Sequence, residues 1–233
     1  MVLLSLMVVG CSEKKTNNND EILSDEDLLN SEDLLNDEEF LELKEERLEK
    51  EREYTKNIAY EAKRLEDGSL LVFIKNNNED MVGVKVDVKF FDNAGNLVDT
   101  GKDRIEGINP GQEVIAQVRN ISYDAETYEI VVTAITNYYI SHLNEVNVTH
   151  NDTGEGIFIK IKNNSDVELD EISAVVLFYR NDEVVAAIKD EVLNLEPEKE
   201  FSVTVSYPRN EESENIDFDR YEVYLNAANE DKY

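Results

Sequence analysis

One pattern of alternating apolar residues occurs twice in this chain, and its second copy begins about 87 residues after the first. The first copy begins with Leu70, Val72 and Ile74, which alternate with other residues and end at a run of asparagines. Alternation with a period of two, closed by turn-forming residues, predicts a β-strand. The second copy has isoleucine at the matching positions, 157, 159 and 161. The repeat therefore predicts two β-units of the same design.

The first copy, residues 69–134, continues as strands joined by turns. Residues 82–90 alternate valine or phenylalanine with glycine and charged residues, which predicts a strand with one buried face and one face exposed to solvent. A turn at Pro110-Gly111 follows, because proline pre-sets φ and glycine accepts a positive φ. Other elements predicted here are a turn at 92–96 and strands at 97–98, 114–118 and 128–134.

The second copy, residues 156–227, keeps the order of the first. It repeats the asparagine-rich strand end at 162–164, the proline turn at 195–200 and the strand after that turn at 201–205. After an insertion at 208–217, its last strand is predicted at 221–225. The long ungapped register indicates a tandem duplication, whereas unrelated β-runs of similar composition would not share it.

The fold predicted is all-β, with two tandem units at residues 54–137 and 138–233. An initial strand at 54–63 turns through Asp67-Gly68 into the Leu70 strand, and 146–149 has the same place in the second unit. Each unit has about 80 to 95 residues, enough for its own core. Because little chain remains between Ala134 and Asn144, we expect the units to be closely coupled and arranged end to end.

Both copies resemble the FxLYD domain, through the sequences VKFFD at residues 88–92 and VVLFY at 175–179. Neither copy has the leading phenylalanine, and only the first keeps the aspartate, as Asp92. The resemblance covers about two thirds of the chain and implies small immunoglobulin-like β-sandwich modules, common in bacterial surface lipoproteins. The family has no catalytic residues to transfer to this sequence.

The beginning of the chain predicts a lipid anchor. Residues 1–10 are apolar, too few to span a bilayer and enough for the core of a signal peptide. Val8-Val9-Gly10-Cys11 resembles the bacterial lipobox, in which the cysteine receives a diacylglycerol thioether and becomes the mature N-terminus. Cys11 is the sole cysteine, which excludes an intramolecular disulfide. No Lys or Arg precedes the apolar run, so we expect the true start to lie upstream of Met1.

Residues 11–53 are predicted to form an acidic, low-complexity stalk between the anchor and the β-units. Apolar pairs recur every six residues or so between Ile22 and Leu41, a period that fits no single helix face, which favours disorder. Residues 37–56 are rich in helix-forming residues and predict a solvated helix. We interpret this helix as a spacer in preference to a site that binds a partner.

The formal net charge of −30 argues against nucleic acid, because phosphate backbones are bound by clustered Lys and Arg. It also argues against adhesion to anionic lipid through protein charge, so attachment to the membrane would rest on the two acyl chains at Cys11. No defined metal site is predicted. The acidic clusters 25–27, 32–33 and 37–39 and the turn 92–96 lack the spacing of a calcium loop, and His142 and His150 have no cysteine near them.

No motif of a nucleophile, a metallopeptidase or a phosphate loop occurs, so we expect no enzyme and no cofactor. The function predicted is that of a lipid-anchored, extracytoplasmic bacterial surface protein acting as a binding or structural module. Its protein partner could pair with an open sheet edge or contact the tyrosines 123, 128, 138 and 139, of which Tyr128 is expected to face the core. The alternative is a ligand- or cation-binding lipoprotein serving a transporter or sensor, with a cleft at the junction near His142 and His150.

Overall fold

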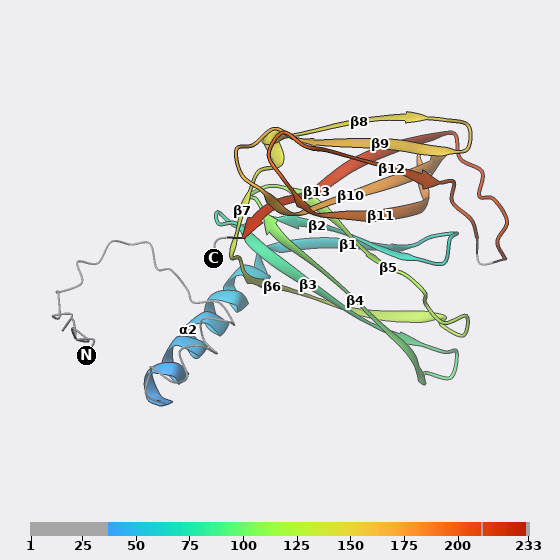
Figure 1. Cartoon of the computed structure of the whole chain (residues 1–233). Coiled ribbons are helices and arrows are strands. Elements are labelled where there is room, and N and C mark those ends of the chain that lie inside the picture. The colour runs from blue at the N-terminus through green and yellow to red at the C-terminus, as the bar shows by residue number, and fades with distance from the viewer. Residues whose placement is uncertain (1–36, 211, 232–233) are drawn as a thin grey trace, which may run out of the picture.

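The computed structural model describes residues 37–210 and 212–231, and the side chains of these residues from Phe40 onward. This part of the chain is mostly antiparallel β-structure, preceded by the helix α2 (Asp37–Lys56), as Figure 1 shows. The all-β fold class predicted from the sequence is therefore confirmed. Cys11 and most of the predicted stalk lie outside the described residues.

The N-terminal half of the β-structure consists of two three-stranded sheets, with the strand orders β1-β2-β5 and β4-β3-β6. The apolar alternate residues of both sheets point at each other and form one buried cluster, which includes Leu70, Val86 and Phe90. The bounds of the strands are β1 (Ile58–Arg64), β2 (Leu70–Asn76), β3 (Val82–Phe91), β4 (Leu97–Ile108), β5 (Glu113–Val118) and β6 (Thr127–Thr136).

The C-terminal half repeats this plan with a three-stranded sheet, β12-β9-β8, and a four-stranded sheet, β11-β10-β13-β7. A second buried cluster, which includes Ile159, Leu169 and Phe178, lies between these sheets. The elements are β7 (Tyr139–Ser141), the 3-10 helix η1 (Leu143–Glu145), β8 (Val146–Asp152), β9 (Gly156–Asn163), β10 (Leu169–Arg180), β11 (Glu183–Leu195), β12 (Glu200–Ser206) and β13 (Arg220–Asp231).

The two halves match at the level of single hydrogen bonds. Asn76 Nδ2 donates to the carbonyl oxygens of Ile108 and Asp80, both at 2.9 Å. Asn163 Nδ2, one repeat later, donates to the carbonyl oxygens of Leu195 and Val167, both at 2.8 Å. Both asparagines are fully buried, so each satisfies backbone groups that water cannot reach. The sequence predicted only a strand end at these positions.

Replacing Asn163 with alanine is expected to lower the free energy of unfolding by about 2 to 4 kcal/mol, because buried carbonyl groups lose their donor. Urea unfolding measures the loss. The neighbouring Asn164→Ala variant is the control, because the Asn164 side chain is exposed and its replacement should change stability little. Equal effects of the two substitutions would contradict a structural role for the buried amide.

The ungapped register predicted between the copies is wrong by one residue in the strand that carries the FxLYD-like sequence. Leu169 takes the place of Val82, but the next core residue is Ile172, where an unbroken repeat would have used Glu171. From there on, Ala174, Val176 and Phe178 face the second core. β10 gains its extra residue at Asp170-Glu171, and the side chains of both residues lie outside the core. Phe178 therefore corresponds to Phe90, one place later than the alignment by sequence.

The predicted helix at residues 37–56 is confirmed, but its last turns contact the β-structure. Thr55 Oγ1 accepts a hydrogen bond from the Ala134 backbone N–H at 3.0 Å, and Glu51 Oε1 accepts one from Thr136 N–H at 3.1 Å. These bonds occupy the edge of β6. The predicted first strand at 54–63 begins too early, because Tyr54 is still helical and β1 starts at Ile58. In Figure 1 the rest of α2 extends away from the sheets.

The two halves pack face to face, so the end-to-end arrangement predicted from the short linker is wrong. A third apolar cluster joins the outer face of the β1-β2-β5 sheet to the outer face of β10 and β11, through residues including Leu71, Ile115, Val175 and Leu177. In Figure 1 the sheets of the C-terminal half accordingly lie above those of the N-terminal half.

Side-chain amides also form hydrogen bonds across this contact between the halves. Asn226 accepts from the Ile115 N–H at 2.9 Å and donates to the Ile115 carbonyl oxygen at 2.7 Å, as a neighbouring strand would. Gln117 Nε2 donates to the Ala187 carbonyl oxygen at 2.6 Å, and its Oε1 accepts from Lys189 N–H at 3.0 Å. The edge of β5 is thus capped by the other half, which removes an edge open to pairing.

Candidate ligand-binding cleft

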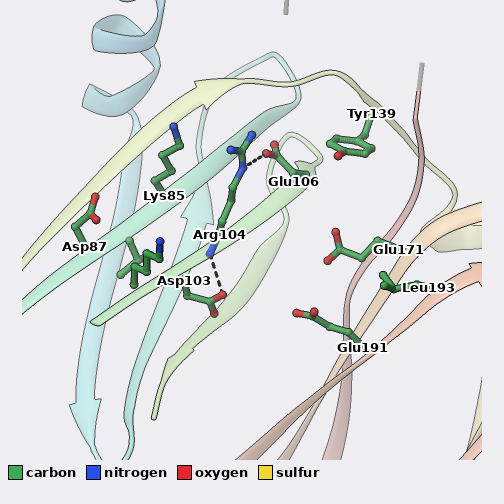
Figure 2. A pocket seen from close by; sticks show the side chains of 11 residues that line it. Lys85, Asp87, Asp103, Arg104, Glu106, Tyr139, Glu171, Glu191 and Leu193 are labelled. Atoms are coloured by element: carbon green, nitrogen blue, oxygen red, sulfur yellow. Dashed lines mark hydrogen bonds and ion pairs between the residues drawn. The ribbon is translucent and has the colours of Figure 1, made fainter. Parts of the chain in front are cut away.

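A cleft of about 690 Å³ lies beside this contact, between the outer face of β3 and β4 and the outward side of β10 and β11. Figure 2 shows its two walls. One wall carries the side chains of Lys85, Asp87, Lys102, Asp103, Arg104 and Glu106, and the other carries those of Glu171, Glu191 and Leu193. Tyr139 of β7 closes one end. The cleft is thus built from both halves of the chain.

Strand alternation positions the charged side chains on the first wall. In β3, Val84, Val86 and Val88 point into the core, so Lys85 and Asp87 point outward. Lys85 pairs across the sheet with Arg104, and Asp87 pairs with Lys102. The like charges of the first pair are partly balanced by the Glu106 carboxylate, which forms an ion pair with Arg104 and is attracted by Lys85. The second pair is complementary.

Glu106 is the most deeply buried charged side chain of the cleft, with 5% of the residue exposed. One of its carboxylate oxygens accepts a bond from Arg104 Nε. The other, Oε2, has no hydrogen-bond partner among the described residues. A Cβ at Gly83 would overlap Oε2, so the glycine in β3 makes room for the carboxylate. Burial raises the pKa of Glu106, and Arg104 only partly opposes this shift.

Glu171 lies across the cleft from Glu106 and has a raised pKa as well. Burial is the main cause, and the charge of Glu191 adds to it, while Lys189 opposes. Glu171 also raises the pKa of Glu106 through charge repulsion. No hydrogen bond or ion pair to the Glu171 carboxylate is found within residues 37–210 and 212–231. The inner part of the cleft therefore holds two carboxyl groups that both disfavour their own negative charge.

Asp103 and Lys189 form the ion pair that spans the two halves next to the cleft. Lys189 Nζ lies 2.9 and 3.2 Å from the two Asp103 carboxylate oxygens, and both side chains are largely buried. Burial lowers the pKa of Lys189, but the charge and hydrogen bonds of Asp103 and Glu191 outweigh it, so the net pKa is raised. Asp103 also accepts from the Gln117 N–H at 2.8 Å. The pair therefore holds the two walls at a fixed separation.

The histidines predicted near the junction do not line this cleft. His142 lies between Glu145 and Glu230, whose carboxylate oxygens are 2.9 and 3.0 Å from its two ring nitrogens. Burial lowers the pKa of His142, but these two hydrogen bonds outweigh it and leave the pKa raised. His150 packs edge-on against Tyr221, with ring centroids 5.4 Å apart. A ligand site at the junction would therefore use carboxylates, not histidines.

The four tyrosines named as aromatic anchors have different surroundings. Tyr123 is 77% exposed, whereas Tyr139 is half-buried at the end of the cleft. Tyr128 was expected to face the core, and its ring does pack edge-on against Phe90, at 6.4 Å between centroids, but the residue remains 37% exposed. Tyr138 is half-buried and does not line the cleft. Tyr139 is the tyrosine that the fold brings to a cavity.

The described part of the chain contains no group of three or more His, Cys, Asp or Glu side chains placed to hold a metal ion. Asp92 uses its carboxylate within its own turn, where it accepts bonds from the N–H groups of Ala94 and Asn96 at 2.9 and 2.8 Å. The acidic clusters 25–27 and 32–33, the side chains of 37–39 and Cys11 lie outside the described residues. Among the described helices, none has the length and apolar character needed to cross a membrane.

Comparisons with known proteins do not identify the chain. No protein-family model matches the sequence, and no curated protein matches it. Among solved structures, 77% of this chain aligns with the crystal structure of red sea bream transglutaminase at 14% identity and a TM-score of 0.21. The alignment covers 31% of the transglutaminase chain. A TM-score this low supports no conclusion about the fold or the activity.

The raised pKa of Glu106 predicts that this residue weakens the fold as the pH rises. A group with a folded pKa above its unfolded value stabilises the fold fully below the unfolded pKa and loses this contribution as the pH rises through the folded pKa. Glutamine keeps the neutral form at every pH. Glu106→Gln should therefore match the wild type near pH 4 and exceed its free energy of unfolding by about 1 kcal/mol at pH 7.

Urea unfolding between pH 4 and 7 measures this effect. Glu129→Gln removes the same charge from an exposed position on β6, and its curve should run parallel to that of the wild type. A Glu106→Gln variant less stable than the wild type at pH 7 would mean that the bond with Arg104 outweighs the cost of burial.

Proposed function

We propose that this protein is a lipid-anchored, extracytoplasmic bacterial surface protein whose β-structure is a non-catalytic binding module. The structural observation that supports the binding role most directly is the charged cleft between the two halves. A purely structural spacer needs no such cavity. The lipobox-like sequence ending at Cys11 supports the anchor.

We further propose that the two halves are immunoglobulin-like domains of the FxLYD type, at residues 54–137 and 138–233. Each half has two antiparallel sheets around a separate apolar cluster, which supports this assignment. The clusters share no residue, so each half has a core of its own. The face-to-face contact then turns two modules into one body with a fixed cleft.

A non-catalytic role fits the chemistry of the cleft. Its carboxyl groups have no serine, cysteine or histidine nucleophile or base beside them among the lining residues. Arg104 and Lys189 already engage carboxylates of the protein. The Asp103–Lys189 pair joins the two walls of the cleft.

A pull-down from solubilised host membranes tests whether the module has a protein partner. The bait is residues 12–233, and a second bait, 57–233, lacks α2 and the acidic segment before it. We expect one partner to be enriched by both baits over an unrelated acidic protein of equal net charge. Loss of the partner with the shorter bait would assign binding to the N-terminal segment. Enrichment by neither bait would contradict a protein-binding role.

The cleft also favours a second candidate function, a ligand-binding lipoprotein that serves a transporter or a sensor. Small-molecule sites are concave and often lie between domains, and about 690 Å³ is within their usual range. The site of this candidate is the cleft with Glu106 and Glu171, in place of the region near His142 and His150.

A further inference from the structure

The strand β8 forms one edge of the β12-β9-β8 sheet, and Figure 1 shows it as the outermost strand of the C-terminal half. At one end of the strand, Thr153 N–H donates to the Gly156 carbonyl oxygen at 2.9 Å. At the other end, Asn164 N–H donates to the Glu145 carbonyl oxygen, also at 2.9 Å. Together with the register between β8 and β9, these bonds show which backbone groups of β8 point away from the sheet, those of residues 146, 148, 150 and 152.

These outward backbone groups form an open edge. Within residues 37–210 and 212–231 they have no backbone partner, and the one bond found is a weak one from Asn151 Nδ2 to the Asp152 carbonyl oxygen at 3.4 Å. Proteins usually keep an edge from pairing with another chain by charges, prolines or bulges. β8 contains no Lys, Arg, Glu or Pro, its aspartate is its last residue, and its register with β9 has no bulge.

Other edges of the described sheets are protected. Side chains cap β5 and β6, as described above. In β11, the Val185 carbonyl oxygen accepts from Glu66 N–H at 3.0 Å, and Ala187 N–H donates to Asp67 at 3.1 Å. β7 has three residues, β4 is rich in charge, and β12 begins with a glutamate and runs close to β11. The strand of the first half that has the place of β8 is β1, and it carries Glu61, Lys63 and Arg64.

The surface next to β8 is one where two copies of this acidic chain can meet. Copies with a net charge of −30 repel each other, so contact between them needs a region with few unpaired acids. Lys160 forms an ion pair with Glu200 at 2.7 Å, and Lys162 forms one with Glu198 at 2.7 Å, so these four charges cancel. The remaining outward side chains of β8 and β9 are uncharged, namely Asn147, Thr149, Asn151 and Phe158.

β8 is complementary to itself in an antiparallel pair. When Thr149 lies opposite the same residue of a second copy, all seven residues of β8 are paired and each outward N–H and C=O group meets a partner. No pair in this alignment brings like charges together, and residues that face the core stay on one face of the sheet. The other opposed pairs are Asn147 with Asn151, Val148 with His150, and Val146 with Asp152.

We propose that two copies of this protein associate through β8, antiparallel about Thr149, and join their β12-β9-β8 sheets into one continuous sheet. The pair also shields Val146 and Val148, whose half-buried side chains pack at the border of the second core. This self-association goes beyond the binding role proposed above and does not depend on the cleft, so either proposal can fail without the other.

Disulfide formation in membranes of the host tests the alignment. Thr149 and its copy form a non-hydrogen-bonded pair, whose Cα atoms are about 4.5 Å apart, and this distance is within the range of a disulfide. Oxidation of a Thr149→Cys variant with copper phenanthroline should therefore give a covalent dimer on a non-reducing gel. The wild type measures any background that arises from Cys11.

Asn147→Cys and Asn151→Cys are the matched controls on the same strand. In the proposed alignment each of these residues lies about 13 Å along the strand from its own copy, so neither variant should cross-link alone. Cells that express both variants together should give the dimer, because residue 147 lies opposite residue 151. Equal cross-linking by all three single variants would indicate random collision and overturn the proposal, as would the absence of a dimer from Thr149→Cys.

A Val148→Pro variant tests whether the backbone of β8 holds the dimer. The N–H that proline removes points outward, so the bonds to β9 remain, while the symmetric pair loses two hydrogen bonds. The dimer should therefore weaken about tenfold or more, as measured by light scattering of the full chain in detergent. Tyr60→Pro makes the same change at the equivalent outward position of β1 and should leave the dimer intact. Circular dichroism confirms that each variant is folded.

The salt dependence gives an independent check. Added salt screens the repulsion between two acidic copies, so the dimer should become stronger as the ionic strength rises. A dimer that dissociates on addition of salt, or one that Val148→Pro leaves unchanged, would overturn pairing through the β8 backbone. A chain that stays monomeric but loses a pull-down partner in the Val148→Pro variant would overturn the second copy as the occupant and assign the edge to a different protein.

Discussion

A Cys11→Ala variant is expected to move from the membrane fraction to the soluble fraction of its host. The thioether sulfur of Cys11 is the proposed attachment point for the acyl chains, and it is the one thiol in the chain. Each buried methylene contributes about 0.8 kcal/mol to membrane binding, so losing two acyl chains reduces the partition by many orders of magnitude. The net charge of −30 offers no substitute attraction to anionic lipid.

Fractionation followed by immunoblotting measures the distribution. Ser12→Ala is the matched control, because it changes the adjacent residue and leaves the thiol in place. The size of the protein on the immunoblot also shows whether the precursor is cleaved, since cleavage before a lipidated cysteine shortens the chain by the residues that precede it. A Cys11→Ala variant that remains in the membrane fraction after a high-salt wash would contradict the lipid anchor.

Several strands could be predicted because their signals are local, whereas β11 and most of β4 could not. Alternation in 82–90 and the Pro110-Gly111 turn depend on a few neighbouring residues, and the structure has β3 and a turn in these places. The register error at Asp170-Glu171 has a different origin. β10 has an extra residue, and the turn that follows it is shorter than in the first copy. The spacing between the two copies is therefore the same before and after this point, so a constant offset in residue number hides the shift.

The contact between the halves has a signal in the sequence. Residues 175–179 are all apolar, whereas Lys89 interrupts the same strand in the first copy. An unbroken apolar run is typical of a strand that is buried on both faces. Val176 and Phe178 do face the second core, while Val175, Leu177 and Tyr179 face the other half.

The cleft had no comparable signal. Lys85, Arg104 and Glu171 occupy outward positions on strands, where charged residues are usual and predict only contact with water. What distinguishes them is the second sheet opposite, and that follows from packing between the halves. Glu106 looks in sequence like any surface glutamate, and the space that makes its burial possible comes from Gly83 on the neighbouring strand.

A Leu177→Asp variant is expected to separate the two halves while each keeps its own core. Leu177 is 1% exposed and belongs to the cluster between the halves, and it contributes to neither of the separate cores. An aspartate there has no partner, and an unpaired buried charge typically costs about 3 to 5 kcal/mol. Opening the contact gives the carboxylate access to water at the expense of the cluster and the amide bonds from Asn226 and Gln117.

Small-angle scattering and urea unfolding test this expectation together. The radius of gyration should increase as the halves move apart, and unfolding should divide into two transitions where the wild type has one. Val131→Asp is the control, since Val131 is 59% exposed on β6 and an added charge there should leave both measurements unchanged. One transition at the wild-type midpoint, with an unchanged radius, would mean that the contact tolerates a charge and does not hold the halves together. Opening would also destroy the cleft, because its walls come from different halves, so Leu177→Asp should abolish binding of any ligand that uses both walls.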